Sequence, residues 1–217
     1  MSGLVLTLPI PIGGARLRAF RGPERAAGVP AGRLWMGAGL TDDELVARGA
    51  DGDEEAFRAL VDRWEQPVFA FLHRMLGSAE EAQDLTQETF LRVVKGAGKY
   101  RASGQFRSWL FRIAGNQARS RLRRRKIVRW VSFDAGTHDV PHERHAERDL
   151  EEAETRDAVR AALARLPERQ RQAVLLRQYQ EMSYREIAEQ IGTTVPAVES
   201  LLHRAMSALR EDLGRNR

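Results

Sequence analysis

The sequence predicts an all-α protein made of two small helical domains that a flexible linker joins. Three observations support this prediction: strand-like alternation is nearly absent, helical periodicity runs through residues 41–126 and 150–213, and residues 127–149 between them have no sustained period. The length of 217 residues suits one or two domains. We therefore expect a flexible basic tail over 1–38, a first domain over 39–126, a linker over 127–149 and a second domain over 150–217.

The expected helices of the first domain begin at short polar residues. Thr41 and Asp42 are suitable N-cap residues for the first helix, and Asp53 is suitable for the second. The helices are expected over 43–49, 54–76, 79–94 and 106–126, and a polar loop over 100–105 precedes the last one. The tail before them is rich in Gly, Pro, Ala and Arg. It is either a basic arm that touches a partner or the product of a start codon assigned too far upstream.

The distribution of charge is more informative than the formal net charge of +5. Residues 41–95 contain 13 acidic and 6 basic side chains, whereas residues 106–126 contain 8 basic and no acidic ones. A block of like charge within a helical pattern indicates a surface that binds a polyanion.

Several classes of function are disfavoured. The chain has no Cys, so disulfides and thiolate metal sites are excluded. Three linker histidines, His138, His142 and His145, make a weak case for a metal site, and we expect none. No catalytic motif, and so no enzyme activity or cofactor, is expected. No apolar run approaches the ~18–20 residues of a membrane span, so membrane insertion is not expected.

The helix over 79–94 has two different faces. Its apolar side carries Ala82, Leu85, Thr89 and Val93. The opposite side carries acidic and amide groups around one exposed leucine, namely Asp84, Gln87, Glu88 and Leu91. This side is either a solvated acidic face, which is the commonest use of such residues, or a docking surface for a basic partner helix.

The helix over 106–126 combines an apolar stripe with a basic face. The stripe consists of Phe106, Trp109, Leu110 and Ile113, and the basic face of Arg112, Asn116, Arg119 and Arg123. Because no acidic residue in this helix can pair with the arginines, phosphate contact is favoured over a solvated face. A buried role is favoured for Trp109 over stacking on an unpaired base. The loop over 100–105 could accept a base that leaves the stack.

Residues 181–211 predict a helix-turn-helix. Ser183 with Glu186 three residues later forms a capping box for the first helix. A turn that includes Gly192 follows, and the second helix has one apolar face of Val198, Leu202, Ala205 and Leu209. In a basic chain, this pattern indicates that the second helix enters the major groove of DNA.

The order of these parts resembles a known family. DLTQETFLRVV, YRASGQFRSWLFRIAGNQARSRLRRR, LPERQRQAVLLRQYQEMSYREIAEQIG and AVESLLHRAMSALR together resemble bacterial sigma factors of the extracytoplasmic-function group, the minimal members of the sigma-70 family. The resemblance covers about residues 41–126 and 150–213, in the order and spacing of the family's regions two and four. The resemblance implies a fold of two helical domains.

The resemblance implies roles for three groups of residues. The second helix of region two would bind core RNA polymerase through Asp84, Gln87, Glu88 and Leu91. The following loop and helix would melt and read the minus-ten element through Tyr100, Arg101, Ser103, Gln105, Trp109, Arg112, Asn116, Arg119 and Arg123. The recognition helix of region four would read the minus-thirty-five element through Val195, Pro196, Ala197, Glu199, Ser200, His203 and Arg204. Glu199 stands where the family often has a basic residue, so no particular promoter sequence is expected.

The resemblance therefore implies a cytoplasmic bacterial sigma factor that binds core polymerase and promoter DNA. It would direct transcription of a stress or envelope-signal regulon under the control of an anti-sigma factor. Two other functions would require different sequence features. An ordinary helix-turn-helix regulator would bind a duplex operator alone and would have no use for an acidic helix followed by an arginine-rich one. A sigma-like protein that binds only anti-sigma factors would have lost most of the basic residues of this helix, whereas residues 106–126 retain them.

Overall fold

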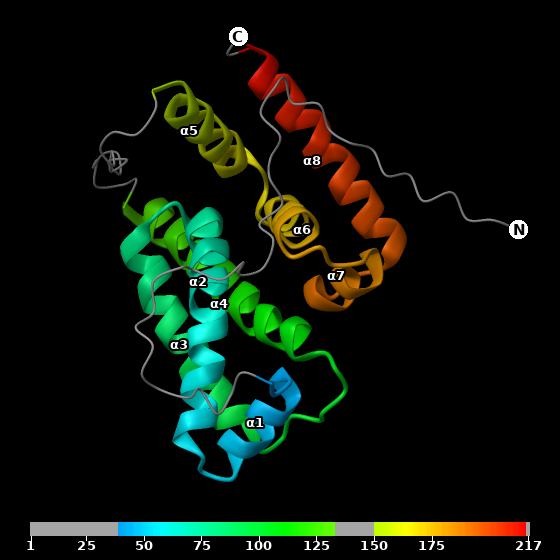
Figure 1. Ribbon diagram of the computed structural model, residues 1–217. Helices are drawn as coiled ribbons and strands as arrows, with labels where there is room; N and C mark the ends of the chain where they lie inside the picture. Colours follow the sequence, from blue (N-terminus) through cyan, green and yellow to red (C-terminus); the bar gives the residue numbers. More distant parts are fainter. Residues whose placement is uncertain (1–38, 133–149, 216–217) are drawn as a thin grey trace, which may run out of the picture. The chain divides into compact units, whose positions relative to one another are not determined.

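A computed structural model describes residues 39–132 and 150–215 of the chain, with side chains described over 39–127 and 157–214. The expected tail and its alternatives, together with His138, His142 and His145, lie outside the described residues. All regular structure in the described part of the chain is helical, which confirms the predicted fold class (Figure 1).

The first bundle consists of α1 (Asp42–Ala50), α2 (Glu54–Leu76), α3 (Ala79–Ala97) and α4 (Phe106–Ser132). The predicted caps of the first two helices are confirmed. Thr41 forms a full capping box with Glu44, and the Asp53 side chain accepts a hydrogen bond from the Ala56 backbone.

Helix α4 is longer than the sequence pattern predicted. It continues through Ser132, into the segment expected to be linker. The residues after Lys126 contain no Gly or Pro before Gly136, so no residue that breaks a helix ends α4 at the predicted position.

The core of the first bundle is formed by the apolar faces that the sequence predicted. All four residues assigned to the inner side of α3 are buried: Ala82, Leu85, Thr89 and Val93. In α4, Phe106 and Leu110 are buried, while Trp109 and Ile113 are partly buried and pack against the core. The buried role favoured for Trp109 is therefore only half correct, because one side of its ring remains accessible.

The second bundle consists of α5 (Leu150–Arg165), α6 (Glu168–Tyr179), α7 (Tyr184–Ile191) and α8 (Val195–Arg215). Helices α7 and α8 form the predicted helix-turn-helix. The capping box of Ser183 and Glu186 is present, and Gly192 ends α7 with φ of 69°, a left-handed conformation that favours glycine. The predicted apolar face of α8 is buried: Val198, Leu202, Ala205 and Leu209.

Helix α2 contacts α5 and α6, and helix α4 contacts α6 and α7. At the centre of this contact Arg171 is 7% exposed and donates hydrogen bonds to the backbone oxygens of Met75 and Leu166. Met75 is in the last turn of α2, where a cation is favoured by the helix dipole. Gly115 of α4 faces Gln172 so closely that a Cβ at Gly115 would collide with the Gln172 amide. The absence of a side chain at Gly115 therefore allows α6 to approach α4.

Candidate nucleic-acid and partner-binding surfaces

The outer face of α3 is acidic with an apolar centre. Asp84 and Gln87 are exposed, Glu88 is half-buried, and Leu91 is 58% exposed. Glu88 pairs with Arg92 at 2.6 Å, which leaves Asp84 as the less engaged carboxylate of the predicted set. Val94, one turn beyond Leu91, is 48% exposed and was missed in the sequence analysis, although its spacing from Leu91 would have revealed it. Two exposed aliphatic residues beside carboxylates suit a partner with apolar and basic groups.

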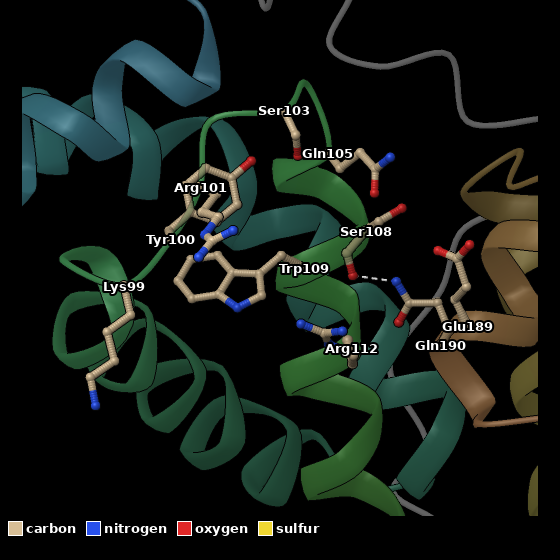
Figure 2. Close-up of a pocket in the computed structure, with 10 residues that line it drawn as sticks. All are labelled: Lys99, Tyr100, Arg101, Ser103, Gln105, Ser108, Trp109, Arg112, Glu189 and Gln190. Carbon is tan, nitrogen blue, oxygen red and sulfur yellow. Dashed lines mark hydrogen bonds between the residues drawn. The ribbon is translucent and has the colours of Figure 1, made fainter.

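The loop before α4 and the first turns of that helix line most of an open cavity of about 220 Å³ (Figure 2). Six of the nine residues predicted to meet the minus-ten element line it: Tyr100, Arg101, Ser103, Gln105, Trp109 and Arg112. Lys99 and Ser108 also line it and were not predicted, although both flank predicted positions. The cavity is smaller than the ~300–1,000 Å³ of a typical small-molecule pocket.

One wall of the cavity is aromatic. The Tyr100 and Trp109 ring centroids lie 4.8 Å apart with the planes tilted by 33°, and Phe106 contacts both rings edge-on from the core side. Gly96 of α3 lies against the indole, because a Cβ there would be 3.0 Å from Trp109 Cζ2. Aromatic faces next to Lys99, Arg101 and Arg112 provide both parts of a single-strand site, stacking and phosphate attraction.

The arginines of α4 divide into two groups. Arg121 and Arg125 both pair with Glu81 of α3, and Arg125 also donates to the Leu76 backbone oxygen at 2.9 Å. The expectation that the α4 arginines lack acidic partners is therefore wrong for these two, because the partner comes from a neighbouring helix. Arg112, Asn116 and Arg123 are exposed and remain available to a polyanion.

Arg119 differs from the other predicted contacts on α4. It is half-buried, donates to Asn116 Oδ1 at 2.5 Å and reaches the Ile191 backbone oxygen at 3.4 Å. Burial is the main cause that lowers its pKa, and the nearby charges of Arg169 and Arg123 act in the same direction. An arginine stays protonated at neutral pH in spite of such a shift. Arg119 therefore joins α4 to the end of α7 in this structure.

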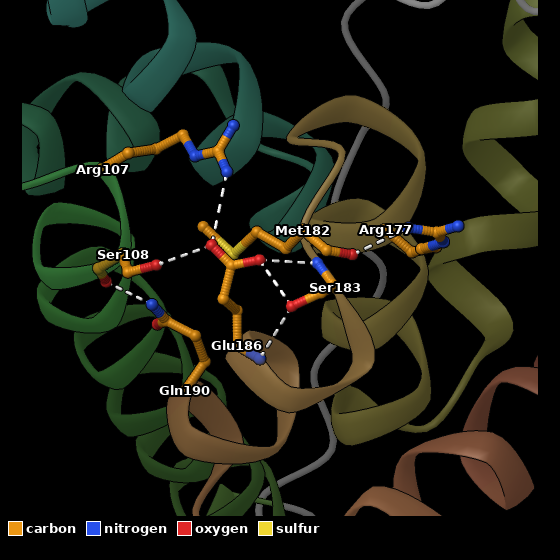
Figure 3. A network of polar contacts seen from close by, with 7 residues as sticks. All are labelled: Arg107, Ser108, Arg177, Met182, Ser183, Glu186 and Gln190. Atoms are coloured by element: carbon orange, nitrogen blue, oxygen red, sulfur yellow. Dashed lines mark hydrogen bonds and ion pairs between the residues drawn. The ribbon is translucent and has the colours of Figure 1, made fainter. Parts of the chain in front are cut away.

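Helix α7 lies against the first turn of α4 (Figure 3). Glu186 Oε1 is 3.4 Å from Arg107 Nη2 and accepts from Ser108 Oγ at 3.3 Å, while the Gln190 amide donates to the Ser108 backbone oxygen. Glu189 and Gln190 complete the lining of the cavity. No local sequence pattern indicates this contact, because Ser108 and Gln190 are 82 residues apart. A nucleic acid that enters the cavity therefore meets α7 at its rim.

The outer face of α8 is largely exposed, so it can enter a groove of DNA. Pro196, Glu199, Ser200, His203 and Arg204 are exposed, and Val195 and Ala197 are half-buried. Thr194 caps this helix by accepting from the Ala197 backbone at 3.4 Å. Ser200 and Arg204 donate to backbone oxygens one turn back, at 3.0 and 3.2 Å. Both side chains lie along the helix and would have to turn outward to reach base edges.

Metal-binding groups and membrane-spanning helices were considered for the described residues only, 39–132 and 150–215. No group of three or more His, Asp or Glu side chains among them could hold a metal ion. Within the same part of the chain, no helix has the length and apolar character needed to cross a membrane.

Comparisons with known proteins agree with the division into two bundles. Residues 60–127 match the family model of sigma-70 region 2, and residues 156–209 match that of sigma-70 region 4. The ECF RNA polymerase sigma-E factor of Haemophilus influenzae is 32% identical over 191 residues, which cover 82% of this chain and 98% of that protein.

Two solved structures are similar over most of the chain. The structure of CnrH in complex with the cytosolic domain of CnrY has a TM-score of 0.60 and 26% identity, and the match covers 81% of this chain and 99% of that one. The sigma factor RpoE of Bartonella quintana, in complex with the anti-sigma factor NepR, has a TM-score of 0.61 and 23% identity, with 74% and 98% covered. The second of these likenesses concerns the fold alone.

Proposed function

Because this chain belongs to the extracytoplasmic-function group of the sigma-70 family, and so is a non-catalytic specificity subunit that directs transcription initiation by RNA polymerase, we propose a role for each of its surfaces. The outer face of α3 binds core polymerase. The cavity before α4 captures an unpaired base of the minus-ten element. The outer face of α8 reads the minus-thirty-five element in the major groove.

The observation that carries the minus-ten assignment is the convergence at the cavity. Residues of the loop and of α4 place the Tyr100 and Trp109 rings beside Arg101 and Arg112, around a space of about 220 Å³. Stacking is worth about 1–3 kcal/mol per base and does not depend on base identity. The energy that holds DNA open thus comes from captured bases and from phosphate contacts of α4, without nucleotide hydrolysis.

The two DNA contacts are expected to be weak separately and strong together. Once polymerase holds the protein at a promoter and α8 is bound upstream, capture of the minus-ten base is intramolecular and benefits from a high effective concentration. The free protein should therefore bind promoter duplex poorly. An operator-binding regulator would behave in the opposite way.

Three further proposals rest on the family. The protein acts in the bacterial cytoplasm and joins the nucleoid when active. An anti-sigma factor holds it inactive, as the resemblance to the extracytoplasmic-function group implies. Its promoters belong to a stress or envelope-signal regulon. The domain boundaries at residues 39, 126 and 150 are proposed as the limits of the polymerase-binding and upstream DNA-binding parts.

Electrophoretic mobility shift on promoter fragments tests the division of roles. Fragments are first selected from genomic DNA by the holoenzyme, and each is then titrated with free protein and with holoenzyme. We expect stable complexes with holoenzyme only, and their loss in Trp109→Ala at the minus-ten element and in Arg204→Ala upstream. Tight binding of the free protein to the same duplexes would contradict the proposal and support an operator-binding regulator.

A further inference from the structure

We propose that Asp43 of α1 is a positioning residue that holds the loop over 100–105 in the shape that receives a base. This inference rests on the proposed minus-ten function of that loop. Asp43 lies outside both matched family regions, which span residues 60–127 and 156–209, so neither match assigns it a role.

Asp43 uses both of its carboxylate oxygens on the loop. Oδ1 accepts a hydrogen bond from the Tyr100 hydroxyl at 2.6 Å, and Oδ2 accepts one from the Gly104 backbone N–H at 2.6 Å. The partners are 57 and 61 residues away in the sequence, so the contact is tertiary and not part of a local turn. Hydrogen bonds to an ionised carboxylate are about twice as strong as those between neutral groups.

The helix that carries Asp43 is itself firmly held. Its start is fixed by the capping box of Thr41 and Glu44. The adjacent Asp42 pairs with Arg63 of α2 at 2.6 Å, and Leu45 is fully buried in the core. A carboxylate on such an element can impose its position on a loop.

The two hydrogen bonds fix the points of the loop that matter for the cavity. Gly104 has φ of 69°, a conformation that other residues adopt only with strain, and its N–H points to Asp43 in that conformation. Tyr100 forms the aromatic wall with Trp109. Burial raises the pKa of Tyr100, and the hydrogen bond to Asp43 raises it further, so the phenol remains a protonated donor. Asp43 therefore positions both the turn at Gly104 and the aromatic wall that Tyr100 forms with Trp109.

The charge of Asp43 provides a way to distinguish a residue that positions the loop from an acidic residue that merely lies near the DNA site. A carboxylate beside a DNA site repels phosphate, so removal of a merely neighbouring acid should strengthen DNA binding, most clearly at low salt. If Asp43 positions the loop, its removal should weaken capture of single-stranded DNA in spite of the lost repulsion. The sign of the effect thus distinguishes the two roles.

The test measures holoenzyme binding to single-stranded DNA by fluorescence anisotropy. The probe is a fluorescein-labelled oligonucleotide selected from a random single-stranded pool by wild-type holoenzyme. The variants are Asp43→Ala, the isosteric Asp43→Asn, Tyr100→Phe and the double variant Asp43→Ala/Tyr100→Phe. Asp51→Ala, at an exposed acidic residue at the other end of α1, is the charge-matched control, and Trp109→Ala reports on the cavity itself.

We expect Asp43→Ala to weaken oligonucleotide binding by about tenfold, Asp43→Asn by less, and Asp51→Ala not at all. The double variant should bind about as weakly as Asp43→Ala, because Tyr100 loses the same partner in both. Affinity for core polymerase should stay unchanged in every variant, which a general loss of folding would not allow.

Three results would overturn the inference in different ways. If Trp109→Ala weakens binding while Asp43→Ala and Asp43→Asn leave it unchanged or tighter, the cavity binds DNA but Asp43 does not position it. If Trp109→Ala also has no effect, the minus-ten assignment is wrong, and the role of Asp43 is rejected with it. A parallel loss of core polymerase affinity in both Asp43 variants would instead assign Asp43 to the folding of α1.

Discussion

Glu186 joins a local helix cap to the contact between the two bundles. Its Oε2 accepts from the backbone N and the Oγ of Ser183, each at 2.7 Å, while its Oε1 faces Arg107 at 3.4 Å and Ser108 Oγ at 3.3 Å (Figure 3). Glu186→Ala therefore removes a capping partner from α7 and an ion pair between α7 and α4 in one change.

The structure indicates how much the cap and the ion pair each contribute to the free energy of unfolding. The reciprocal cap is worth about 0.3–1.5 kcal/mol. The ion pair adds about 1 kcal/mol or less, because the Arg107 and Glu186 side chains are 39% and 30% exposed and solvent screens them. We expect Glu186→Ala to lower the free energy of unfolding by about 1–2 kcal/mol, and Arg107→Ala by about 1 kcal/mol or less.

Urea unfolding of the two single variants and the double variant, at low and high salt, gives the coupling free energy between Arg107 and Glu186. The coupling should shrink as salt is raised. In contrast, the coupling between Ser183 and Glu186 should persist, because those groups are joined by short hydrogen bonds. No coupling between Arg107 and Glu186 at low salt would refute the reasoning and mean that α7 does not rest on α4 in solution.

Acid should remove the contribution of Glu186. Burial acts to raise its pKa, but hydrogen bonds from Ser183 and the charge and hydrogen bond of Arg107 outweigh burial, and the pKa is lowered. A carboxyl group whose pKa falls on folding stabilises the native state above its unfolded pKa of about 4.3, and that stability is lost as the pH falls through the folded pKa. The stability difference between wild type and Glu186→Gln should therefore vanish in acid.

Three other predictions concern the proposed interfaces. Leu91→Ala should weaken core polymerase binding by about tenfold and leave the free energy of unfolding nearly unchanged, because Leu91 is 58% exposed. Val93→Ala should instead lower the free energy of unfolding, because Val93 is 1% exposed. Fluorescence titration measures the binding and urea unfolding measures the stability. Arg123→Ala should reduce the salt slope of holoenzyme–promoter binding by about one, whereas Arg125→Ala, which breaks the pair with Glu81, should mainly lower the melting temperature. Arg204→Ala should weaken the binding of holoenzyme to duplex DNA that carries the upstream element. The loss should be about 1–3 kcal/mol if Arg204 reads a base, and less if Arg204 only contacts phosphate.

The helices and their packing faces could be predicted from the sequence because they depend on local rules. Period, caps and glycine stops lie within a few residues of one another, so the capping box at Ser183 and the buried face of α8 were recognised directly. The family resemblance, and with it the sigma factor function, rested on motifs that are also local in sequence. The family matches confirm it.

Contacts between distant residues could not be predicted in the same way. Glu81 pairs with Arg125, 44 residues later, and this pair turns part of an apparent DNA-binding face into a structural one. Asp43 reaches Tyr100 and Gly104 across the bundle, and its sequence neighbours gave no sign of that role. Period and spacing identify which side chains share a face, but tertiary packing decides which of them remain free to bind a partner.

Run-off transcription with sigma-free core polymerase tests the central claim most directly. Purified protein is added to core enzyme on pooled genomic promoter fragments, beside the double variant Asp84→Ala/Glu88→Ala on the outer face of α3. Asp62→Ala/Glu65→Ala, an exposed acidic pair on α2, is the matched control. Discrete transcripts that depend on the protein, weakened by the α3 variant and unchanged by the control, are the predicted result. An absence of transcripts, with tight duplex binding by the free protein, would contradict the account.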